Sequence, residues 1–283
     1  NILSQKPSAI VIGAGFAGSS TATCLAQEGW EVTLLEKHQG PGGRARKFSE
    51  AGFTFDMGPS WYWMPDVFER YFNRFGKTTA DYYDLIRLDP SYKVVFGTND
   101  YMDIPAELDA LKAKFDELEP GSGARLDDFL AQAAYKYQVG INKLVYKPGR
   151  SLTEFMSPKL LIDMVRMDIF QSMYKHVRKY FKHERILQLI EFPILFLGAT
   201  PQNTPALYSL MNYADISLGT WYPKGGMHKI VEGMVALAEE LGVQFRYEQA
   251  VRQIKVTNGK ATAVETSQGT YEADVIIAGC DYH

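Results

Sequence analysis

The stretch AIVIGAGFAGSSTATCLAQEGWEVTLLE at residues 9–36 decides the fold of this chain. Residues 9–12 are a short apolar run, as expected for a parallel strand that is buried on both faces. The glycine-rich turn GAGFAG follows at residues 13–18, a helical segment continues to about Glu28, and a second apolar run occupies residues 31–35. This order predicts a strand–turn–helix–strand unit with a right-handed crossover.

The glycine pattern of this turn predicts a dinucleotide site. Gly13 permits the tight turn, Gly15 lets the backbone approach a pyrophosphate, and Gly18 allows the helix to pack closely on the strand. The following helix N-terminus offers unpaired N–H groups and a partial positive charge to phosphates. Glu36, at the end of the second strand, is placed to hold ribose hydroxyls, which disfavours NADP and leaves NAD and FAD.

The rest of the sequence alternates strand and helix patterns. Further strands and hairpins are predicted at residues 92–104, 243–247, 251–266 and 273–278. Helices are predicted at residues 61–75, 105–118, 127–143, 158–194 and 226–241, with a Gly- and Pro-rich loop at 39–60. The predicted fold class is α/β. A Rossmann-like domain (residues 1–90 and 219–283) is interleaved with a mostly helical substrate- or membrane-facing domain (residues 91–218).

The composition narrows the class of protein. The 283 residues are 46% apolar and 22% charged, and the net charge of −3 lacks the basic footprint of a nucleic-acid binder. The 17 Tyr and 16 Phe suit either an ordinary core or a large apolar ligand. Cys24 and Cys280, like the scattered histidines, have no metal-ligand spacing, so we expect neither a metal site nor a disulfide framework.

Localisation signals are few. No run of about twenty uncharged apolar residues occurs, so no transmembrane helix is expected. The first seven residues are too short and too polar for a signal peptide. The sequence therefore favours a cytoplasmic protein.

Two further motifs follow Glu36. Gly42-Gly43-Arg44-Ala45 would let backbone N–H groups and one guanidinium meet an anionic cofactor, although a solvated loop with a surface arginine gives the same pattern. FDMGPS follows at residues 55–60. In series with GAGFAG and Glu36, these motifs are much more specific than any one of them.

The order GAGFAG, LLEKH, GPGGRAR, GFTFDMGPS and, much later, TWYPKGGMHKIVEGM resembles bacterial-type phytoene desaturases and related carotenoid desaturases, which have an FAD-dependent amine oxidase-like fold. The resemblance covers essentially the whole chain and implies FAD as the cofactor. It also implies roles for matching residues. These are Gly13, Ala14, Gly15, Phe16, Ala17 and Gly18 at the diphosphate, Glu36 and Lys37 at the adenosine ribose, Gly43, Arg44 and Ala45 at the diphosphate and ribityl region, Gly58, Pro59 and Ser60 near the isoalloxazine ring, and the backbone of Val251 at the adenine.

The resemblance also implies an activity. Two hydrogens would leave a saturated carbon pair beside a polyene, with hydride passing to the flavin and oxygen or a membrane quinone reoxidising it. No general base is identified, and Trp221, Tyr222 and Pro223 fit either the boundary of flavin and substrate or interdomain packing. Members of this family are longer, so the resemblance implies that the chain is an N-terminal part of a longer protein.

Other interpretations share these motifs. A flavoenzyme that isomerises or ketolates carotenoids, or that saturates retinoids, would carry all of them. An FAD amine oxidase shares the fold but would show an aromatic cage and a covalent flavin site. A non-enzymatic lipid-binding relative would keep the fold without the flavin, although GAGFAG and Glu36 argue against it.

A membrane contact is suggested by residues 159–185, where basic side chains flank apolar ones at helical spacing. Such a helix can lie on the inner face of an anionic membrane, and carotenoid precursors dissolve in membranes. Apolar residues at helical spacing are also common in a protein core. The apolar positions are Leu160, Leu161, Met164, Met167, Phe170, Met173, Tyr174, Val177 and Phe181.

Overall fold

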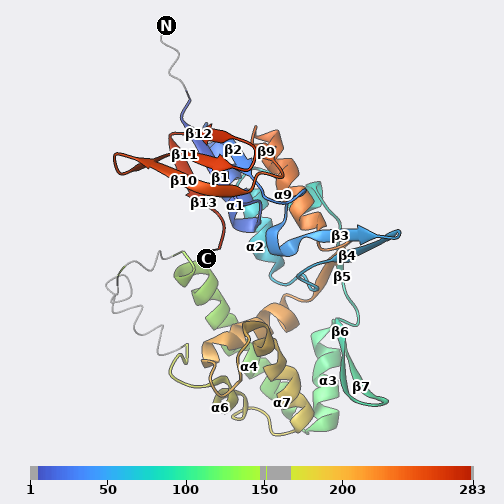
Figure 1. Ribbon diagram of the computed structural model, residues 1–283. Coiled ribbons are helices and arrows are strands. Elements are labelled where there is room, and N and C mark those ends of the chain that lie inside the picture. The colour runs from blue at the N-terminus through green and yellow to red at the C-terminus, as the bar shows by residue number, and fades with distance from the viewer. Residues whose placement is uncertain (1–5, 147–150, 152–166, 282–283) are drawn as a thin grey trace. The chain divides into compact units, whose positions relative to one another are not determined.

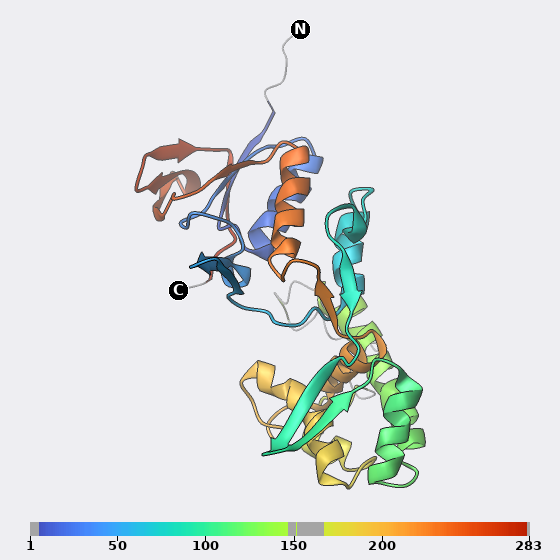
Figure 2. The same ribbon diagram turned by 90° about the vertical axis from the view of Figure 1, so that its right-hand side faces the viewer.

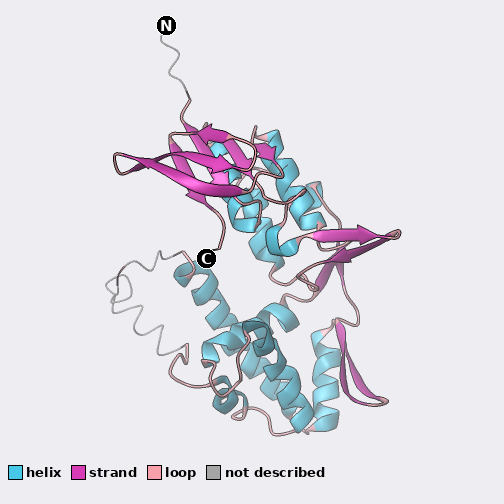
Figure 3. Cartoon of the chain, viewed as in Figure 1, coloured by secondary structure: helices cyan, strands magenta, loops and turns pink. Residues whose placement is uncertain are grey.

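The computed structural model describes residues 6–146, 151 and 167–281 (Figure 1). The chain forms two compact units. The first, here called the sheet unit, comprises Asn1–Tyr62, Asp66–Ile86 and Tyr222–His283, and the second, the helical unit, comprises Trp63–Pro65 and Arg87–Trp221. Strands predominate in the sheet unit and helices in the helical unit (Figure 3).

The centre of the sheet unit is a parallel sheet with the strand order β13-β1-β2-β9. Its strands are β1 (Ser8–Ile12), β2 (Glu31–Leu35), β9 (Gln244–Arg246) and β13 (Val275–Ala278). Each adjacent pair is parallel, so the predicted strand–helix–strand unit and the late return of strands to it are confirmed.

Both faces of this sheet are covered. On one face, α1 (Phe16–Gln27) and α9 (Lys229–Glu240) pack through Ala22 and Ala238 against Val11 and Leu34. On the other, Val264 packs against Ile10 and Leu35. Figures 1 and 2 show helices on one side of this sheet and further strands on the other. This burial on both faces explains why the strands are apolar runs instead of alternating patterns.

The second layer is an antiparallel sheet of β10 (Val251–Thr257), β11 (Lys260–Thr266) and β12 (Thr270–Glu272). The predicted hairpin around Asn258-Gly259 is confirmed. Both turn residues have positive φ, 52° and 78°, as the favoured two-residue hairpin turn requires.

The prediction of a loop over residues 39–60 is wrong for the second half of this range. The chain there forms the antiparallel pair β3 (Lys47–Glu50) and β4 (Phe53–Asp56), after a single 3-10 turn, η1 (Gly43–Ala45). All four β3 residues are exposed, so there is no alternation of burial and the usual strand signal is missing.

The helix predicted from Trp61 begins at Pro65 instead, as α2 (Pro65–Asn73), because proline is favoured in the first helical turn. A 3-10 turn, η2 (Thr79–Asp81), and strand β5 (Leu85–Arg87) follow, and β5 pairs with β8 (Trp221–Pro223).

The helical unit contains the predicted hairpin and a set of mostly short helices. The hairpin is β6 (Tyr92–Gly97) and β7 (Asp100–Ile104), and the longer helices are α3 (Leu108–Leu118) and α4 (Ser122–Val139). The remaining elements are η3 (Gly140–Leu144), α6 (Met173–Val177), α7 (Glu184–Glu191), η5 (Phe192–Leu197), η6 (Ala206–Ser209), α8 (Leu210–Asn212) and η7 (Tyr213–Ser217).

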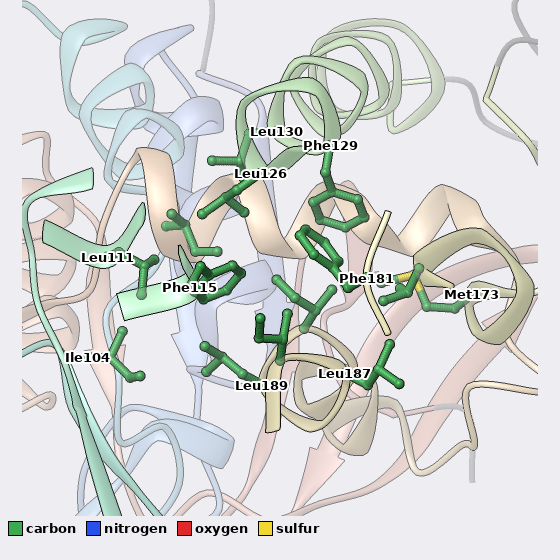
Figure 4. Close-up of a cluster of buried hydrophobic side chains, with 14 of the residues drawn as sticks. Ile104, Leu111, Phe115, Leu126, Phe129, Leu130, Met173, Phe181, Leu187 and Leu189 are labelled. Atoms are coloured by element: carbon green, nitrogen blue, oxygen red, sulfur yellow. The ribbon is translucent and has the colours of Figure 1, made fainter. Parts of the chain in front are cut away.

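An apolar cluster forms the core of the helical unit. Phe115 of α3, Phe129 of α4 and Leu189 of α7 point into it, and Ile104 closes it from β7 (Figure 4). Phe115 and Phe181 meet edge to face with ring centroids 5.7 Å apart, the arrangement that aromatic pairs prefer.

The prediction of mostly helical structure over residues 158–194 is correct only in part, because the described residues form short helices instead of one long helix. The predictions for Leu160, Leu161 and Met164 lie outside the described residues. Met167, Met173, Val177 and Phe181 are buried, so the core interpretation is confirmed for these four. Tyr174 is half-buried, whereas Phe170 is 86% exposed. Among the described residues no helix combines the length and the apolar character needed to cross a bilayer.

Candidate functional site

The carboxyl ends of β1, β2 and β13 meet at one edge of the parallel sheet. The Gly13 N–H donates to the Leu35 carbonyl over 2.8 Å, and the Gly279 N–H donates to the Ile12 carbonyl over 2.9 Å. Glu36 follows directly at the end of β2. Ligands of parallel α/β sheets bind at this edge, so Gly13 and Glu36 lie at the edge of the sheet where the sequence predicts a dinucleotide.

The glycine turn joins β1 to α1 with very little space. Gly13 has a φ of 98°, which side-chain-bearing residues rarely adopt. A Cβ atom on Gly18 would lie 1.8 Å from the Gly13 carbonyl oxygen, so only glycine fits. Helix α1 starts at Phe16 after Gly15, which has no side chain to cap it. The N–H groups of its first turn can therefore bind an anion.

Glu36 is buried beside this turn, with only 4% of its surface exposed. Its Oε2 accepts a hydrogen bond from the Ala14 N–H at 2.8 Å, and its Oε1 accepts one from the His38 N–H at 2.9 Å. Its backbone is tied to the Arg246 carbonyl and the Gln249 N–H, both at 2.8 Å. Because each carboxylate oxygen can accept more than one hydrogen bond, Glu36 can also accept from ribose hydroxyls.

The GGRA segment lies against the glycine turn, as the combined motifs predict. The Gly42 N–H donates to the Ala14 carbonyl over 2.7 Å. A Cβ atom on Gly43 would lie 3.1 Å from the Gly15 Cα. Two backbone segments that carry predicted diphosphate residues are therefore side by side.

The Gly58 segment is held against GGRA in turn. A Cβ atom on Gly58 would lie 2.0 Å from the Arg44 carbonyl oxygen. Pro59 is half-buried and Ser60 exposed. The Arg44 side chain is 92% exposed and forms a salt bridge with Asp281 at 3.5 Å, so its backbone lies in the cluster while its guanidinium does not.

Asp56 and His228 are structural residues of this cluster that the sequence did not reveal. The Asp56 carboxylate accepts from the Tyr222 hydroxyl (3.1 Å), the Met227 N–H (2.9 Å) and the His228 N–H (3.1 Å). His228 Nδ1 lies 2.9 Å from the Ala45 carbonyl oxygen. The start of α9 is thereby fixed to η1 and β4. The sequence signals near these residues were two family-like motifs, FDMGPS with Asp56 and TWYPKGGMHK with His228.

Val251 begins β10 and packs against Ile10 and Leu35. Two residues earlier, the Gln249 N–H is bonded to the Glu36 carbonyl, so this segment does pass the acid. The core role of Val251 is supported, and its backbone contact with adenine stays a prediction.

The remaining predicted residues lie at the surface of the same cluster. The Phe16 side chain is half-exposed and meets Phe68 edge to face at 6.0 Å. Ala17 and Lys37 are exposed. Gly279 was not predicted, although a Cβ atom there would lie 2.9 Å from the Gly18 Cα, so it belongs to the tight packing around the turn.

A second polar cluster lies in the helical unit, away from these residues in sequence. Lys136 is fully buried, and its Nζ lies 3.0 Å from Asp168 Oδ2 and 3.2 Å from His176 Nε2. Burial, and then the Lys136 ammonium beside it, lowers the pKa of His176 to about 4. Within the described ranges no group of three or more His, Cys, Asp and Glu side chains is arranged to hold a metal ion.

Another buried acid of the helical unit has an unusual pKa. Asp215 is 3% exposed, and burial raises the pKa of its carboxyl to about 6, although hydrogen bonds from Tyr92 and Thr220 oppose the shift. The group binds a proton more tightly in the folded than in the unfolded chain. Its contribution to the free energy of unfolding is therefore full below about pH 4 and is lost as the pH rises through about 6.

This gives a pH-dependent expectation for Asp215→Asn, whose amide does not titrate. Relative to wild type, the variant should gain about 3 kcal/mol in free energy of unfolding between pH 4 and pH 7, because a pKa unit corresponds to about 1.4 kcal/mol. Urea unfolding of both proteins at the two pH values measures this difference. A wild-type-to-variant difference that does not change with pH would contradict the raised pKa.

Comparison with known proteins agrees with this geometry. The family model described as flavin containing amine oxidoreductase matches residues 16–283. The carotenoid 3,4-desaturase of Haloarcula japonica is 40% identical over 274 residues, which are 96% of this chain and 55% of that protein. The zeta-carotene-forming phytoene desaturase of Myxococcus xanthus is 36% identical over 273 residues, 96% of this chain and 53% of that protein. The chain thus spans about half the length of these curated relatives.

Among solved structures, a redesigned putrescine oxidase matches with a TM-score of 0.60 at 16% identity, over 96% of this chain and 58% of that one. At this identity the likeness shows the fold alone. The parallel sheet, the glycine turn and the buried acid at its edge define a dinucleotide-binding protein. The chain belongs to the flavin containing amine oxidoreductase family. Its cofactor is FAD, which fits the cradle where the Gly15 and Gly43 backbones approach each other.

Glu36→Gln should weaken FAD binding about tenfold or more, because a hydrogen bond to a charged group contributes about 1.5–3 kcal/mol. The amide also turns an NH₂ group toward the Ala14 or His38 N–H, both of which are donors. Titration of the complete apoprotein with FAD, followed by flavin fluorescence, measures the Kd. Glu31→Gln, at the exposed start of β2, is the matched control. Equal affinities for the two variants would remove Glu36 from the cofactor site.

Proposed function

We propose that the complete protein is an FAD-dependent desaturase that removes hydrogen from a carotenoid precursor such as phytoene, in carotenoid biosynthesis. The observation that carries the proposal is the 40% identity to a carotenoid 3,4-desaturase over 96% of the chain, together with the intact cofactor edge of the sheet. The aligned 274 residues are 96% of this chain, so the alignment includes residues of both units.

The chain's own residues hold and orient the cofactor. The N–H groups at the start of α1 would bind the diphosphate, and Glu36 would bind the adenosine ribose. Asp56 and His228 hold the GGRA and Gly58 segments in place through the hydrogen bonds to α9 and Ala45. When bound, FAD supplies a two-electron acceptor that takes up hydride.

The substrate class sets what the rest of the protein has to do. A carotenoid precursor has no charge and no hydrogen-bonding groups, so recognition has to come from apolar contact and from positioning. The cation that develops beside a polyene is stabilised by the conjugated chain itself. We propose no general base among the described residues, and oxygen or a membrane quinone as the electron acceptor.

Expression of the complete gene product in a phytoene-accumulating bacterial host tests the activity. Pigments are extracted, resolved by chromatography and identified by their polyene spectra. New absorption at longer wavelength supports desaturation, and the band positions count the double bonds added. Unchanged phytoene, from a protein that carries reducible FAD, would exclude phytoene as the substrate.

A second candidate substrate is a more unsaturated carotenoid. The relative with 40% identity is a carotenoid 3,4-desaturase, and the one with 36% identity is a phytoene desaturase. Expression in a host that accumulates the more unsaturated carotenoid distinguishes this substrate from phytoene. A purified protein without a reducible flavin spectrum would instead support a non-enzymatic lipid-binding role.

We also propose peripheral contact with the inner face of the cell membrane, because the substrate is dissolved there. Four of the apolar residues first considered for this contact are buried, so the contact would involve other side chains. Flotation of the complete protein with anionic liposomes tests it. Protein that stays at the bottom of the gradient would exclude the contact.

A further inference from the structure

Trp63 is held in the helical unit by a chain of hydrogen bonds. Its indole Nε1–H donates to the Thr220 hydroxyl over 2.8 Å, and that hydroxyl donates to Asp215 Oδ1 over 2.8 Å. The other carboxylate oxygen accepts from the Tyr92 hydroxyl over 2.5 Å. Thr220 is fully buried, so water does not compete for these bonds. The hydrogen bonds to Thr220 and Asp215 therefore fix the orientation of the Trp63 ring from its buried N–H side.

A buried carboxylate needs hydrogen bonds to replace those it made with water. The hydrogen bonds of Asp215 connect it to two aromatic residues, one directly and one through Thr220. Both oxygens of Asp215 are used, one by Tyr92 and one, through Thr220, by Trp63. The guanidinium of Arg87 adds a favourable charge and donates to the Thr220 carbonyl over 3.2 Å. Buried ionic groups are poor stabilisers compared with apolar packing, so a positioning role accounts for this group better than stability does.

The rings that this network orients form one cluster. Trp63 meets Phe196 edge to face at 5.5 Å and Phe192 at 6.4 Å, and Tyr92 meets Phe192 at 5.4 Å. The front of the cluster is exposed. Phe196 is 58% exposed and its neighbour Leu195 is 70% exposed. A cluster with a buried polar back and an exposed apolar front is typical of a binding surface for an apolar ligand.

We propose that Trp63 and Phe196 form the surface on which the polyene chain of the substrate lies, and that Asp215, acting through Thr220, is the positioning residue for Trp63. This inference rests on the function proposed above. A long, uncharged, partly conjugated chain can stack on aromatic rings and needs no polar partner.

Thr220→Val tests the positioning role, with Thr220→Ser as the matched control. Valine keeps the shape but breaks both hydrogen bonds of the Thr220 hydroxyl, whereas serine retains them. With phytoene in liposomes and the FAD-loaded complete protein, we expect Thr220→Val to raise KM about 5- to 10-fold. The serine variant should stay near wild type, and both should bind FAD as tightly as wild type does.

Trp63→Phe keeps an aromatic ring but loses the five-membered ring of the indole with its N–H, and it remains informative if the valine variant folds poorly. It should raise KM by a similar factor, and the double variant Trp63→Phe/Thr220→Val should be no worse than either single one, since all remove the same bond. Additive effects, or an unchanged KM in Thr220→Val, would overturn the inference.

Two further outcomes distinguish this inference from membrane binding and from a failure of the proposed function. If Phe196→Ser abolishes flotation with substrate-free liposomes but leaves KM unchanged, the aromatic front binds the membrane and the inference is wrong. If wild type forms no polyene from phytoene or from a more unsaturated carotenoid, the proposed function fails. Quenching of tryptophan fluorescence by an added polyene then still reports binding, and loss of quenching in Trp63→Phe still supports the surface.

Discussion

Gly18→Ala is expected to prevent folding of the sheet unit, whereas Gly15→Ala should leave the unit folded and weaken FAD binding. A Cβ atom on Gly18 would lie 1.8 Å from the Gly13 carbonyl oxygen, and both groups are backbone, so neither can move aside. Overpacking at side chains costs about 1–3 kcal/mol, and a backbone clash at this distance should exceed about 4 kcal/mol. At Gly15 the nearest atom would be the Gly43 Cα at 4.0 Å.

The reason for the difference is that the two glycines serve different partners. Gly15 has φ −77° and ψ −179°, which alanine adopts without strain, so the fold does not require glycine there. What the added methyl group excludes is the diphosphate. Loss of a hydrogen bond to a charged group predicts a 10- to 100-fold rise in the Kd for FAD.

Thermal unfolding of the apoproteins and flavin titration measure the two effects separately. Gly97→Ala is the control, because a Cβ atom there has no neighbour within 4 Å. It should match wild type in both measurements. Wild-type FAD affinity in a folded Gly15→Ala protein would contradict the position of the diphosphate, and a stable Gly18→Ala protein would contradict the packing.

Asp168→Asn should destabilise the helical unit by about 3 kcal/mol, and Lys136→Met by much less. Removing one partner of a buried ion pair leaves an uncompensated buried charge, which costs about 3–5 kcal/mol. Lys136 is fully buried, whereas its partner Asp168 has 29% of its side chain exposed. Without Asp168 the ammonium would keep its contacts to His176, Ala206 and Ser209 but would have no counter-charge. Replacing the lysine by an apolar side chain of similar length removes the charge itself.

Asparagine is chosen because it should not add backbone strain at position 168, so the comparison measures the loss of the charge alone. Asp168 has a φ of 54°, a conformation that asparagine tolerates about as well as aspartate. Urea unfolding of both single variants and the double variant gives the coupling energy. The double variant should resemble Lys136→Met. Equal destabilisation by the two single variants would show that the pair acts symmetrically and would refute the argument.

Lys136→Met has a second consequence that NMR titration can detect. The ammonium contributes, after burial, to the lowered pKa of His176. Without it, the pKa of His176 should rise from about 4 toward its usual value while burial keeps it depressed. Leu130→Ala, which leaves Lys136 in place, is the control. Loosening the core also raises the pKa of His176 by reducing its burial, so only a larger rise in Lys136→Met supports the role of the ammonium.

The parts of the fold that the sequence predicted are those with a local signal. The glycine turn, the acid at the end of β2 and the Asn258-Gly259 turn each lie within a few residues of the element they define. The β3–β4 hairpin has no such signal, because its residues are mostly exposed and its turn is Ala51-Gly52.

The missed residues of the site depend on distant partners. Asp56 bonds to Met227, 171 positions away, and Gly279 packs on Gly18 from the far end of the chain. Asp215 resembles an ordinary surface acid in sequence, and only the folded chain shows that it is buried behind an aromatic cluster. Long-range packing of this kind leaves no pattern of spacing to read.

The interleaved order of the two units has a consequence for synthesis. Strand β2 ends at Leu35, but its neighbour β9 starts only at Gln244, and β13, the other neighbour of β1, starts at Val275. A ribosome adds about 5–20 residues per second, so β1 and β2 keep unpaired edges for roughly 10–40 seconds. All of the helical unit emerges during that interval. The cofactor edge is therefore among the last parts of this chain to form, and exposed strand edges in the nascent chain are where aggregation or chaperone binding would begin.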